Sequence, residues 1–445
     1  MSVKVGMICL GCAKNQVDGE MLMAALRNGG FETVSDPAES DIAIINTCGF
    51  IDSAKKESIG EILDLVDLKN DGVISKIVVT GCLAERYKDE IRRDIPEVDA
   101  VLGIGANADI VNKFKELCDG EAVESFPDKY QMPLCGDRDL STPNYFAYLK
   151  IAEGCDNNCT YCAIPMIRGK QRSRTIENIM EEAENLVANG VKELIVIAQD
   201  TSRYGIDIYG EYSLAKLLKS LATIENLKWI RVLYCYPEAI TEELIDVFAS
   251  EDKVVKYLDL PLQHASGRVL KRMNRRGDRE KLTKLINTLR ERIPGIILRS
   301  TFIAGFPGET EEDFTELAEF VKEMEFDRMG CFAYSQEEGT PAARMKEQLD
   351  EETKEDRARI IMEMQMDIMD RINRRHIGKK LEVMVEGWDE DVEAWFGRSY
   401  MDAPDVDGFV YFNSDNDYEL GDFVMVEIED ATDADLYGSE VSVEC

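Results

Sequence analysis

Six of the twelve cysteines in this chain are spaced as ligands of iron–sulfur clusters. Three of them, Cys155, Cys159 and Cys162, form one tight run in the segment EGCDNNCTYC. Because a 4Fe–4S cluster has four irons, three cysteine ligands leave one iron open to a substrate or cofactor. A structural zinc site normally takes four ligands, and no fourth cysteine or histidine lies near this run. The run therefore predicts a catalytic 4Fe–4S cluster with one open iron.

Three further cysteines, Cys12, Cys48 and Cys82, each end an apolar run, in VKVGMICLGC, DIAIINTC and KIVVTGC. Successive members are 36 and 34 residues apart, close to one βα unit of roughly 30 residues. Ligand sites of open α/β sheets lie at the carboxyl edge of the strands, where thiolates from three loops can converge. We therefore expect a second metal site at this edge.

The elements that must position these cysteines predict an α/β protein of three domains. Residues 1–139 alternate short apolar runs with helical patterns, which indicates an open parallel sheet. Residues 140–375 carry six strand patterns and then a helix, which predicts a partial (βα)6 barrel with its chemistry at the C-terminal strand ends. Residues 376–445 carry several short strand patterns, which predict a small OB-like β-barrel.

Composition limits the location and the partners of the protein. No stretch of 18 apolar residues appears and the N-terminus lacks signal-peptide features, so we expect a cytoplasmic protein without membrane contact. The formal net charge of −35 argues against broad nucleic-acid binding. From Leu381 to Cys445 there are 20 acidic residues and one basic residue, a net charge of −19. This acidity either follows from an acidic proteome or forms a docking face for a basic partner.

The motifs around the six cysteines resemble a known family. The run C-x3-C-x2-C with Tyr161 before its last cysteine resembles the radical S-adenosylmethionine (SAM) enzymes. The segments LGCAKN, NTCGFIDSAKKES, VTGCLAERY and AIPMIRGKQRSR are similar to the methylthiotransferases of that superfamily. The resemblance implies that SAM binds the open iron and yields a 5′-deoxyadenosyl radical. It also implies that Cys12, Cys48 and Cys82 hold an auxiliary 4Fe–4S cluster and that the C-terminal module is of the TRAM type.

Two substrate classes compete within this family, an adenosine of tRNA and an aspartate of ribosomal protein S-twelve. The segments LGCAKNQVDGE and GRSYMDAPDVDG look like the ribosomal-protein type, and Ala13-Lys14 replaces the Gln-Met pair typical of the tRNA type. The acidic C-terminal domain would repel tRNA and attract a basic ribosomal protein, free or on the small subunit. The resemblance then implies methylthiolation of the aspartate β-carbon, with one SAM as methyl donor and another as radical source. A tRNA methylthiotransferase and a non-catalytic iron–sulfur redox protein are the alternatives.

Six residues near the barrel strand ends are candidate SAM contacts, although an ordinary role in turns and caps is as good an interpretation for any one of them. They are Tyr161, Gln199, Asp200, Gln263, Arg299 and Phe306. His264 is either a general base or a hydrogen-bonded structural histidine. The basic stretches Arg168–Arg174 and Lys271–Arg279 either form a solvated surface or bind a carboxylate of SAM or substrate. The remaining cysteines are interpreted as packing residues: Cys9, Cys118, Cys135, Cys235, Cys331 and Cys445.

Overall fold

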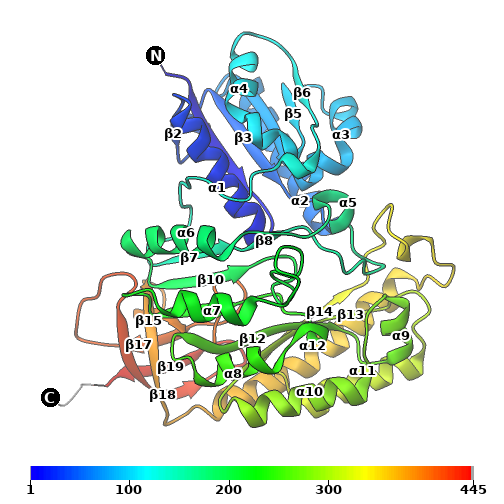
Figure 1. Ribbon diagram of the computed structural model, residues 1–445, viewed down its shortest axis with the longest axis vertical. Helices are drawn as coiled ribbons and strands as arrows, with labels where there is room; N and C mark the ends of the chain where they lie inside the picture. Colours follow the sequence, from blue (N-terminus) through cyan, green and yellow to red (C-terminus); the bar gives the residue numbers. More distant parts are fainter. Residues whose placement is uncertain (1, 442–445) are drawn as a thin grey trace.

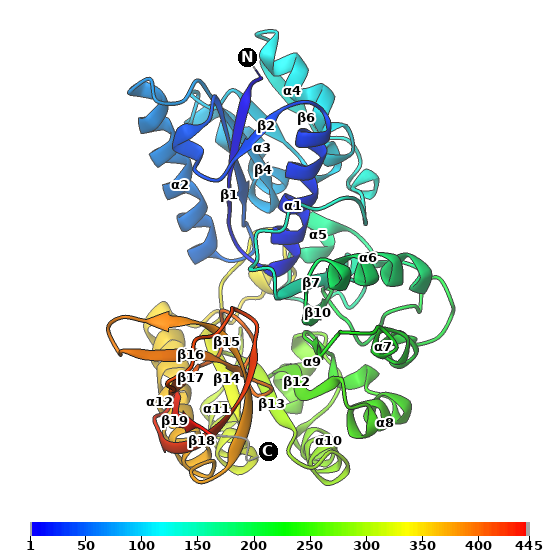
Figure 2. The ribbon, with the colours of Figure 1, turned by 90° about the vertical axis from the view of Figure 1, so that its left-hand side faces the viewer.

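The computed structural model describes residues 2–441 and arranges them as three units. Figures 1 and 2 show an N-terminal α/β unit at one end, a central sheet covered by helices, and a C-terminal β-barrel beside that sheet. Within residues 2–441, no helix combines the length and the apolar character that a membrane crossing requires. Cys445 lies outside the described residues.

The N-terminal unit is a six-stranded parallel sheet with the order β2-β1-β3-β4-β5-β6. Its elements are β1 (Lys4–Cys9), α1 (Ala13–Asn28), β2 (Glu32–Val34), β3 (Ile42–Thr47), α2 (Asp52–Asn70), β4 (Lys76–Gly81), α3 (Cys82–Asp94), β5 (Ala100–Leu102), α4 (Ile110–Cys118) and β6 (Val123–Ser125). Both faces are covered, because α1 and α4 pack on one face and α2 and α3 on the other. The all-buried run of β3 is typical of a strand in such a sandwiched parallel sheet.

The central unit is also a six-stranded parallel sheet, with the order β14-β13-β12-β11-β10-β7. Its strands are β7 (Phe146–Lys150), β10 (Glu193–Ile197), β11 (Trp229–Val232), β12 (Val254–Gln263), β13 (Ile297–Ala304) and β14 (Arg328–Ala333). Its helices are α6 (Ile176–Ala188), α7 (Leu214–Ala222), α8 (Glu242–Ser250), α9 (Gly267–Arg272), α10 (Arg279–Arg292), α11 (Glu311–Met324) and α12 (Glu351–Arg374). The six predicted strands and the partial barrel are confirmed.

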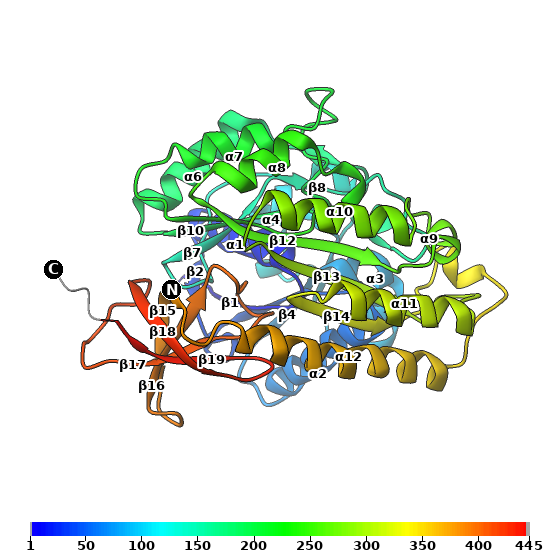
Figure 3. The same cartoon turned by 90° about the horizontal axis from the view of Figure 1, so that it is seen from below.

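Alternation along each central strand divides its side chains between two surroundings. On β10, Leu194 and Val196 point into the core shared with the outer helices. Ile195 and Ile197 point to the inner face, which the C-terminal barrel covers. Figure 3 shows the helices along the outer side of the sheet and the barrel against its other side. The C-terminal barrel therefore packs on the apolar inner face of the central sheet and shields it from solvent.

The C-terminal unit is a closed five-stranded barrel with the order β15-β16-β17-β19-β18. Its strands are β15 (Lys380–Asp389), β16 (Ala394–Ser399), β17 (Val410–Asn413), β18 (Phe423–Ala431) and β19 (Leu436–Glu440). On β18, buried Val424, Val426 and Ile428 alternate with half-buried Met425 and exposed Glu427 and Glu429, which is the pattern of a half-buried strand. The predicted small β-barrel is confirmed.

Buried ion pairs hold the C-terminal barrel against the central sheet. Glu193 accepts hydrogen bonds from Arg231 at 2.7 Å and from Arg398 at 2.8 Å. Arg328 donates to Asp402 at 2.7 Å, and Tyr257 donates to Asp407 at 2.6 Å. Part of the acidity of the C-terminal domain is therefore neutralised inside the protein.

We expect Arg398→Leu to destabilise the protein by about 3 to 5 kcal/mol, because a broken buried pair leaves an uncompensated charge. Burial raises the pKa of the Glu193 carboxyl, but Arg398 and Arg231 outweigh it and lower the pKa below the ordinary value of 4.5. The ion pairs of Glu193 thus stabilise the folded protein above about pH 4.5, and this contribution is lost as the pH falls below that value and Glu193 becomes protonated. Urea unfolding followed by circular dichroism measures both effects. Lys219→Leu, at an exposed pair with Glu243, serves as the control and should change little.

Candidate active site

The cysteine run Cys155–Cys162 lies in the loop that follows the first strand of the central sheet. The short strand β8 (Ala152–Glu153) leads into it, and α5 (Ile164–Arg168) and β9 (Arg172–Ser173) follow it. Pairing of β8 with β9 and a hydrogen bond from the Cys155 N–H to the Gly169 carbonyl, at 3.1 Å, close the loop. Cys155 and Cys159 are buried, and Cys162 is half-buried. The loop therefore presents three thiols at the C-terminal end of the sheet.

These thiols lie close enough to affect one another electrostatically. Burial raises the pKa of Cys155 to about 12, and the neighbouring Cys159 adds to the shift. Burial also raises the pKa of Cys162, again with contributions from Cys159 and Cys155. Because metal ligation requires thiolates, binding of iron here must release protons.

The second triad is assembled at the carboxyl edge of the N-terminal sheet. Cys12 precedes α1, Cys48 follows β3, and Cys82 begins α3 directly after β4. The three loops pack closely, because a Cβ built on Gly11, which has a φ of +90°, would lie 2.9 Å from the Cys48 sulfur. Cys12 raises the pKa of both other thiols in addition to their burial. The strand-end positions expected from the sequence are those that the structure gives.

Cys12 differs electrostatically from the other two members of its triad. Its side chain is solvent-exposed, although surrounding protein atoms desolvate the thiol. That desolvation raises the pKa of Cys12, but the cations of Lys14 and Arg168 outweigh it and lower the pKa below the ordinary value. Its side of the triad is thus open and electropositive.

The strand-end triad contacts the segment that follows the cysteine run, across the boundary between the first two units. Cys82 packs in one small buried cluster with Ala163 and Ile167, which directly follow Cys162 in the chain. From the same helix, Arg168 places its Nη2 atom 3.3 Å from the Cys82 sulfur. The short helix α5 is therefore shared by both triads.

A buried charge network lies beside this contact. Arg168 pairs with Asp18 of α1 and with Glu153, the latter at 3.1 Å. Lys150 pairs with the same two carboxylates, at 3.1 Å from Glu153. Burial raises the pKa of Glu153, but Arg168 and Lys150 outweigh it and hold the pKa well below its ordinary value. The network balances two cations against two anions and joins the two units.

Two charged residues in the sequence indicate this network. Lys150 and Glu153 are charged residues inside the otherwise apolar segment YFAYLKIAEG, immediately before the first cysteine of the run. Charged residues are almost never fully buried unless they are paired. Their pairing with α1 becomes visible only in the folded chain.

The donor set of each triad fits a 4Fe–4S cluster. Residues 2–441 contain no group of three cysteine, histidine, aspartate or glutamate side chains arranged to hold a single metal ion. In a 4Fe–4S cluster each cysteine binds a different iron, so its thiols stand farther apart than the ligands of one ion. Both triads are all-thiol, and thiolates are the ligands that iron–sulfur clusters take. Around the Cys155 triad, three buried polar atoms lack a hydrogen-bond partner: Tyr161 Oη, Gln199 Oε1 and Arg275 Nη1.

Comparison with known proteins shows the family. A radical SAM superfamily model matches residues 149–321, an uncharacterized family, UPF0004, matches residues 4–103, and a TRAM domain model matches residues 377–441. The ribosomal protein uS12 methylthiotransferase RimO of Clostridioides difficile strain 630 is 48% identical over 98% of each chain. That of Thermoanaerobacter sp. strain X514 is 48% identical over 98% of this chain and 99% of its own. The chain belongs to the RimO family. It is accordingly a radical SAM methylthiotransferase.

Solved structures share the fold of this RimO family member at low sequence identity. The radical SAM methyltransferase TsrM from Kitasatospora setae, with cobalamin and a [4Fe-4S] cluster bound, has a TM-score of 0.58 and 16% identity over 77% of each chain. The cobalamin-dependent radical SAM enzyme OxsB with aqua-cobalamin bound has a TM-score of 0.51 and 13% identity over 80% of this chain and 56% of its own. These similarities support the fold alone.

The candidate SAM contacts fall into two groups in the RimO-type fold. Tyr161 is part of the cysteine run, Gln199 donates to Glu153 at 2.7 Å, and Asp200 accepts from Asn157 of the run at 2.7 Å. These three lie around the Cys155 triad. Asp200 also lines a cavity of about 290 Å³ that includes Tyr236.

The contacts found for the other three candidates are with residues outside the cysteine run. Gln263 ends β12 with a left-handed backbone, at a φ of 71°. Arg299 pairs with Asp259 at 3.2 Å and approaches Asp407 of the C-terminal barrel at 3.7 Å. Phe306 is fully buried and packs edge-on against Tyr334, with a centroid distance of 5.3 Å. The side chains of Arg299 and Phe306 therefore have structural partners, and their contact with SAM stays a prediction.

The histidine and two arginines of the basic stretches have partners inside the protein. His264 is buried, lies 3.2 Å from Glu309 through Nε2 and accepts the Ser266 N–H at Nδ1, which makes it a hydrogen-bonded structural residue. Arg174 is buried against Glu182. Arg275 stacks on the ring of Tyr236 at 4.0 Å, and the Tyr236 hydroxyl lies 3.7 Å from the Cys159 sulfur.

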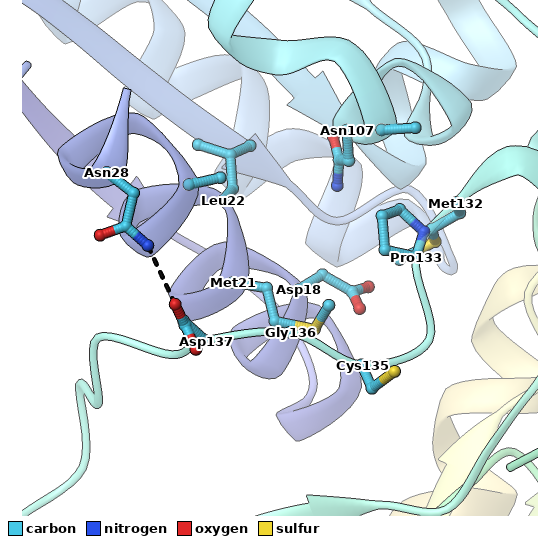
Figure 4. Close-up of a pocket in the computed structure, with 12 residues that line it drawn as sticks. Asp18, Met21, Leu22, Asn28, Asn107, Met132, Pro133, Cys135, Gly136 and Asp137 are labelled. Atoms are coloured by element: carbon cyan, nitrogen blue, oxygen red, sulfur yellow. Dashed lines mark hydrogen bonds between the residues drawn. The ribbon is translucent and has the colours of Figure 1, made fainter. Parts of the chain in front are cut away.

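The prediction that all remaining cysteines are packing residues is partly wrong. Cys235 and Cys331 are buried, and Cys9 is half-buried against Asn46, but Cys118 and Cys135 are exposed. Cys135 lies in the segment between the first two units and lines a cavity of about 240 Å³ beside α1 (Figure 4). Cys118 ends α4 on its solvent side. Neither position has the apolar pattern that would bury a thiol.

Proposed function

We propose that this enzyme adds a methylthio group to the β-carbon of an aspartate of ribosomal protein uS12, the protein named S-twelve above. The observation that carries the proposal is the contact of Cys82 with the helix that directly follows Cys162. This contact places the strand-end triad against the segment that follows the cysteine run. Transfer of sulfur to a carbon that is activated at the cysteine run requires such proximity. The names of the curated relatives support the substrate.

Two 4Fe–4S clusters would be held by the two triads, one by Cys155, Cys159 and Cys162 and one by Cys12, Cys48 and Cys82. When bound, these groups and SAM supply a 5′-deoxyadenosyl radical and the sulfur to be methylated and transferred. Tyr161, Gln199 and Asp200 are the candidate SAM contacts nearest the first triad. The unpartnered atoms Tyr161 Oη and Gln199 Oε1 support a polar ligand there.

The protein's own residues hold the joint between the first two units in place. The network of Arg168, Lys150, Asp18 and Glu153 ties α1 and α5 to the first strand of the central sheet. Because its charges are mutually paired and buried, we expect it to fix the relative position of the two units that carry the triads. Such positioning is the contribution that a protein makes to cofactor chemistry.

The acidic C-terminal barrel supports a basic protein as the partner. Some of its acidic residues, such as Asp402 and Asp407, are engaged with internal cations. Others are exposed on the β15–β16 turn, on the loop before β18 and on β18 itself: Glu390, Asp391, Glu393, Asp415, Asp417, Glu419, Glu427, Glu429 and Asp430. Such a surface would speed the encounter with basic uS12 and would repel a phosphate backbone.

The test is modification of both candidate substrates by the reconstituted enzyme. We expect mass spectrometry to show a methylthio group on uS12 and none on tRNA after incubation with SAM and dithionite under anaerobic conditions. A uS12 variant with asparagine at the target position is the matched control. Methylthio-adenosine in tRNA together with unchanged uS12 would show that the substrate proposal is wrong.

A further inference from the structure

Lys14 is a buried lysine without a carboxylate partner. Its side chain is 7% exposed, yet no carboxylate within residues 2–441 forms an ion pair with it. The two other buried lysines, Lys150 and Lys354, each pair with a carboxylate. A buried cation is costly unless it is paired, so the position of Lys14 calls for a ligand anion.

The surroundings of Lys14 act on its charge in both directions. Lys14 lies in the first turn of α1, two residues after Cys12, where the helix dipole disfavours a cation. Burial and Arg168, a second cation, lower the pKa of Lys14, but Tyr234 and the Cys12 thiol outweigh them and raise it, so the side chain stays a cation. Its contact is the ring of Tyr234, with Nζ 3.4 Å from the ring centroid. A cation–π contact with an uncharged ring leaves the positive charge unneutralised.

The central sheet holds Tyr234 in a strained conformation to make this contact. Tyr234 follows β11 and has a φ of 62°, which is uncommon for a bulky residue. Its N–H donates to Asp259 Oδ2 at 2.9 Å, and its carbonyl accepts from the Thr201 N–H at 3.0 Å. Backbone strain of this kind persists only where surrounding structure fixes it, and it clusters at ligand clamps. Lys14 and Tyr234 thus come from two units and meet at the strand ends that carry the triads.

We propose that Lys14 binds the side-chain carboxylate of the target aspartate and thereby selects aspartate as the substrate. In aspartate the carboxyl carbon is bonded directly to the β-carbon, so an anchor on the carboxylate fixes the reacting carbon within one bond. The position next to Cys12 places that anchor at the open, electropositive side of the strand-end triad. This inference rests on the proposed function.

The test compares two peptides and three forms of the reconstituted enzyme. One peptide is the uS12 segment with its target aspartate, and the other carries asparagine there. The enzymes are the unaltered protein, Lys14→Met and Lys14→Arg. Fluorescence anisotropy in the presence of SAM measures the dissociation constant of each peptide from each enzyme. We expect Lys14→Met to raise the dissociation constant of the aspartate peptide by about 10- to 100-fold, which is the effect of losing one charged hydrogen bond. The asparagine peptide should bind equally to all three, and Lys14→Arg should keep most of the preference for aspartate.

The controls separate binding from loss of the site. Iron content and the visible cluster spectrum of Lys14→Met should match those of the unaltered enzyme. Lys253→Met, at a half-buried lysine before β12 whose Nζ donates to the Ile224 carbonyl at 2.6 Å, should leave the binding of both peptides unaffected. Equal weakening of both peptides, or an unchanged preference for aspartate in Lys14→Met, would overturn the assignment. If the unaltered enzyme binds and modifies neither peptide, the proposed function itself fails, which is a different outcome.

Discussion

The triple variant with alanine at Cys155, Cys159 and Cys162 should lose all formation of 5′-deoxyadenosine and keep about one 4Fe–4S cluster's worth of iron. The loss is expected because these cysteines would hold the cluster whose open iron binds SAM. The remaining iron is expected because Cys12, Cys48 and Cys82 come from a different sheet with its own core. Anaerobic reconstitution followed by iron analysis and chromatography of the SAM products measures both quantities.

A reciprocal variant makes this experiment decisive. Alanine at Cys12, Cys48 and Cys82 should also halve the iron, but it should abolish methylthio transfer while 5′-deoxyadenosine still forms. Cys118→Ala, at an exposed thiol remote from both triads, controls for loss of adventitious iron. If the first triple variant retains no iron, the strand-end triad does not hold a cluster. If it still forms 5′-deoxyadenosine, the assignment of the radical site to Cys155–Cys162 is wrong.

The elements that hold the triads were predictable because each is encoded locally. The six central strands are apolar runs bounded by turns, and the strand-end cysteines follow directly from the period of a βα unit. The strands β2, β6 and β19 were not predicted, because β2 and β6 have only three residues each and β19, with the sequence LYGSE, lacks an apolar alternation. Such short pairings depend on the neighbouring strand more than on their own sequence.

The surroundings of the triads could not be predicted from the sequence. The contact of Lys14 with Tyr234 and the pairs of Arg168 with Asp18 join residues more than 100 positions apart. Nothing in the local pattern of α1 separates buried Asp18 and Glu20 from ordinary exposed acidic residues of a helix. Similarly, the position of Arg299 on its strand suggested a ligand contact, but its partner Asp407 comes from the C-terminal barrel. Long-range pairing therefore decides which charged residues belong to the site.

Arg168→Met should destabilise the joint between the first two units by about 3 to 5 kcal/mol and lower the iron bound at the strand-end triad. Arg168 is 1% exposed, and its removal leaves Asp18 and Glu153 with only Lys150 as a counter-charge. It also removes the donor that lies 3.3 Å from the Cys82 sulfur. Urea unfolding and iron content measure the two effects. Arg359→Met, at a solvent-exposed pair on α12, is the control and should change neither quantity.

A second substitution tests whether charge balance is the cause. In Arg168→Met the network carries two anions and one cation, and adding Asp18→Asn restores one of each. We therefore expect the double variant to be more stable than Arg168→Met alone, although Asp18→Asn by itself is also destabilising because it leaves an excess cation. Such non-additivity is the signature of groups in direct contact. If the two effects simply add, packing of the Arg168 side chain, and not its charge, holds the two triads together.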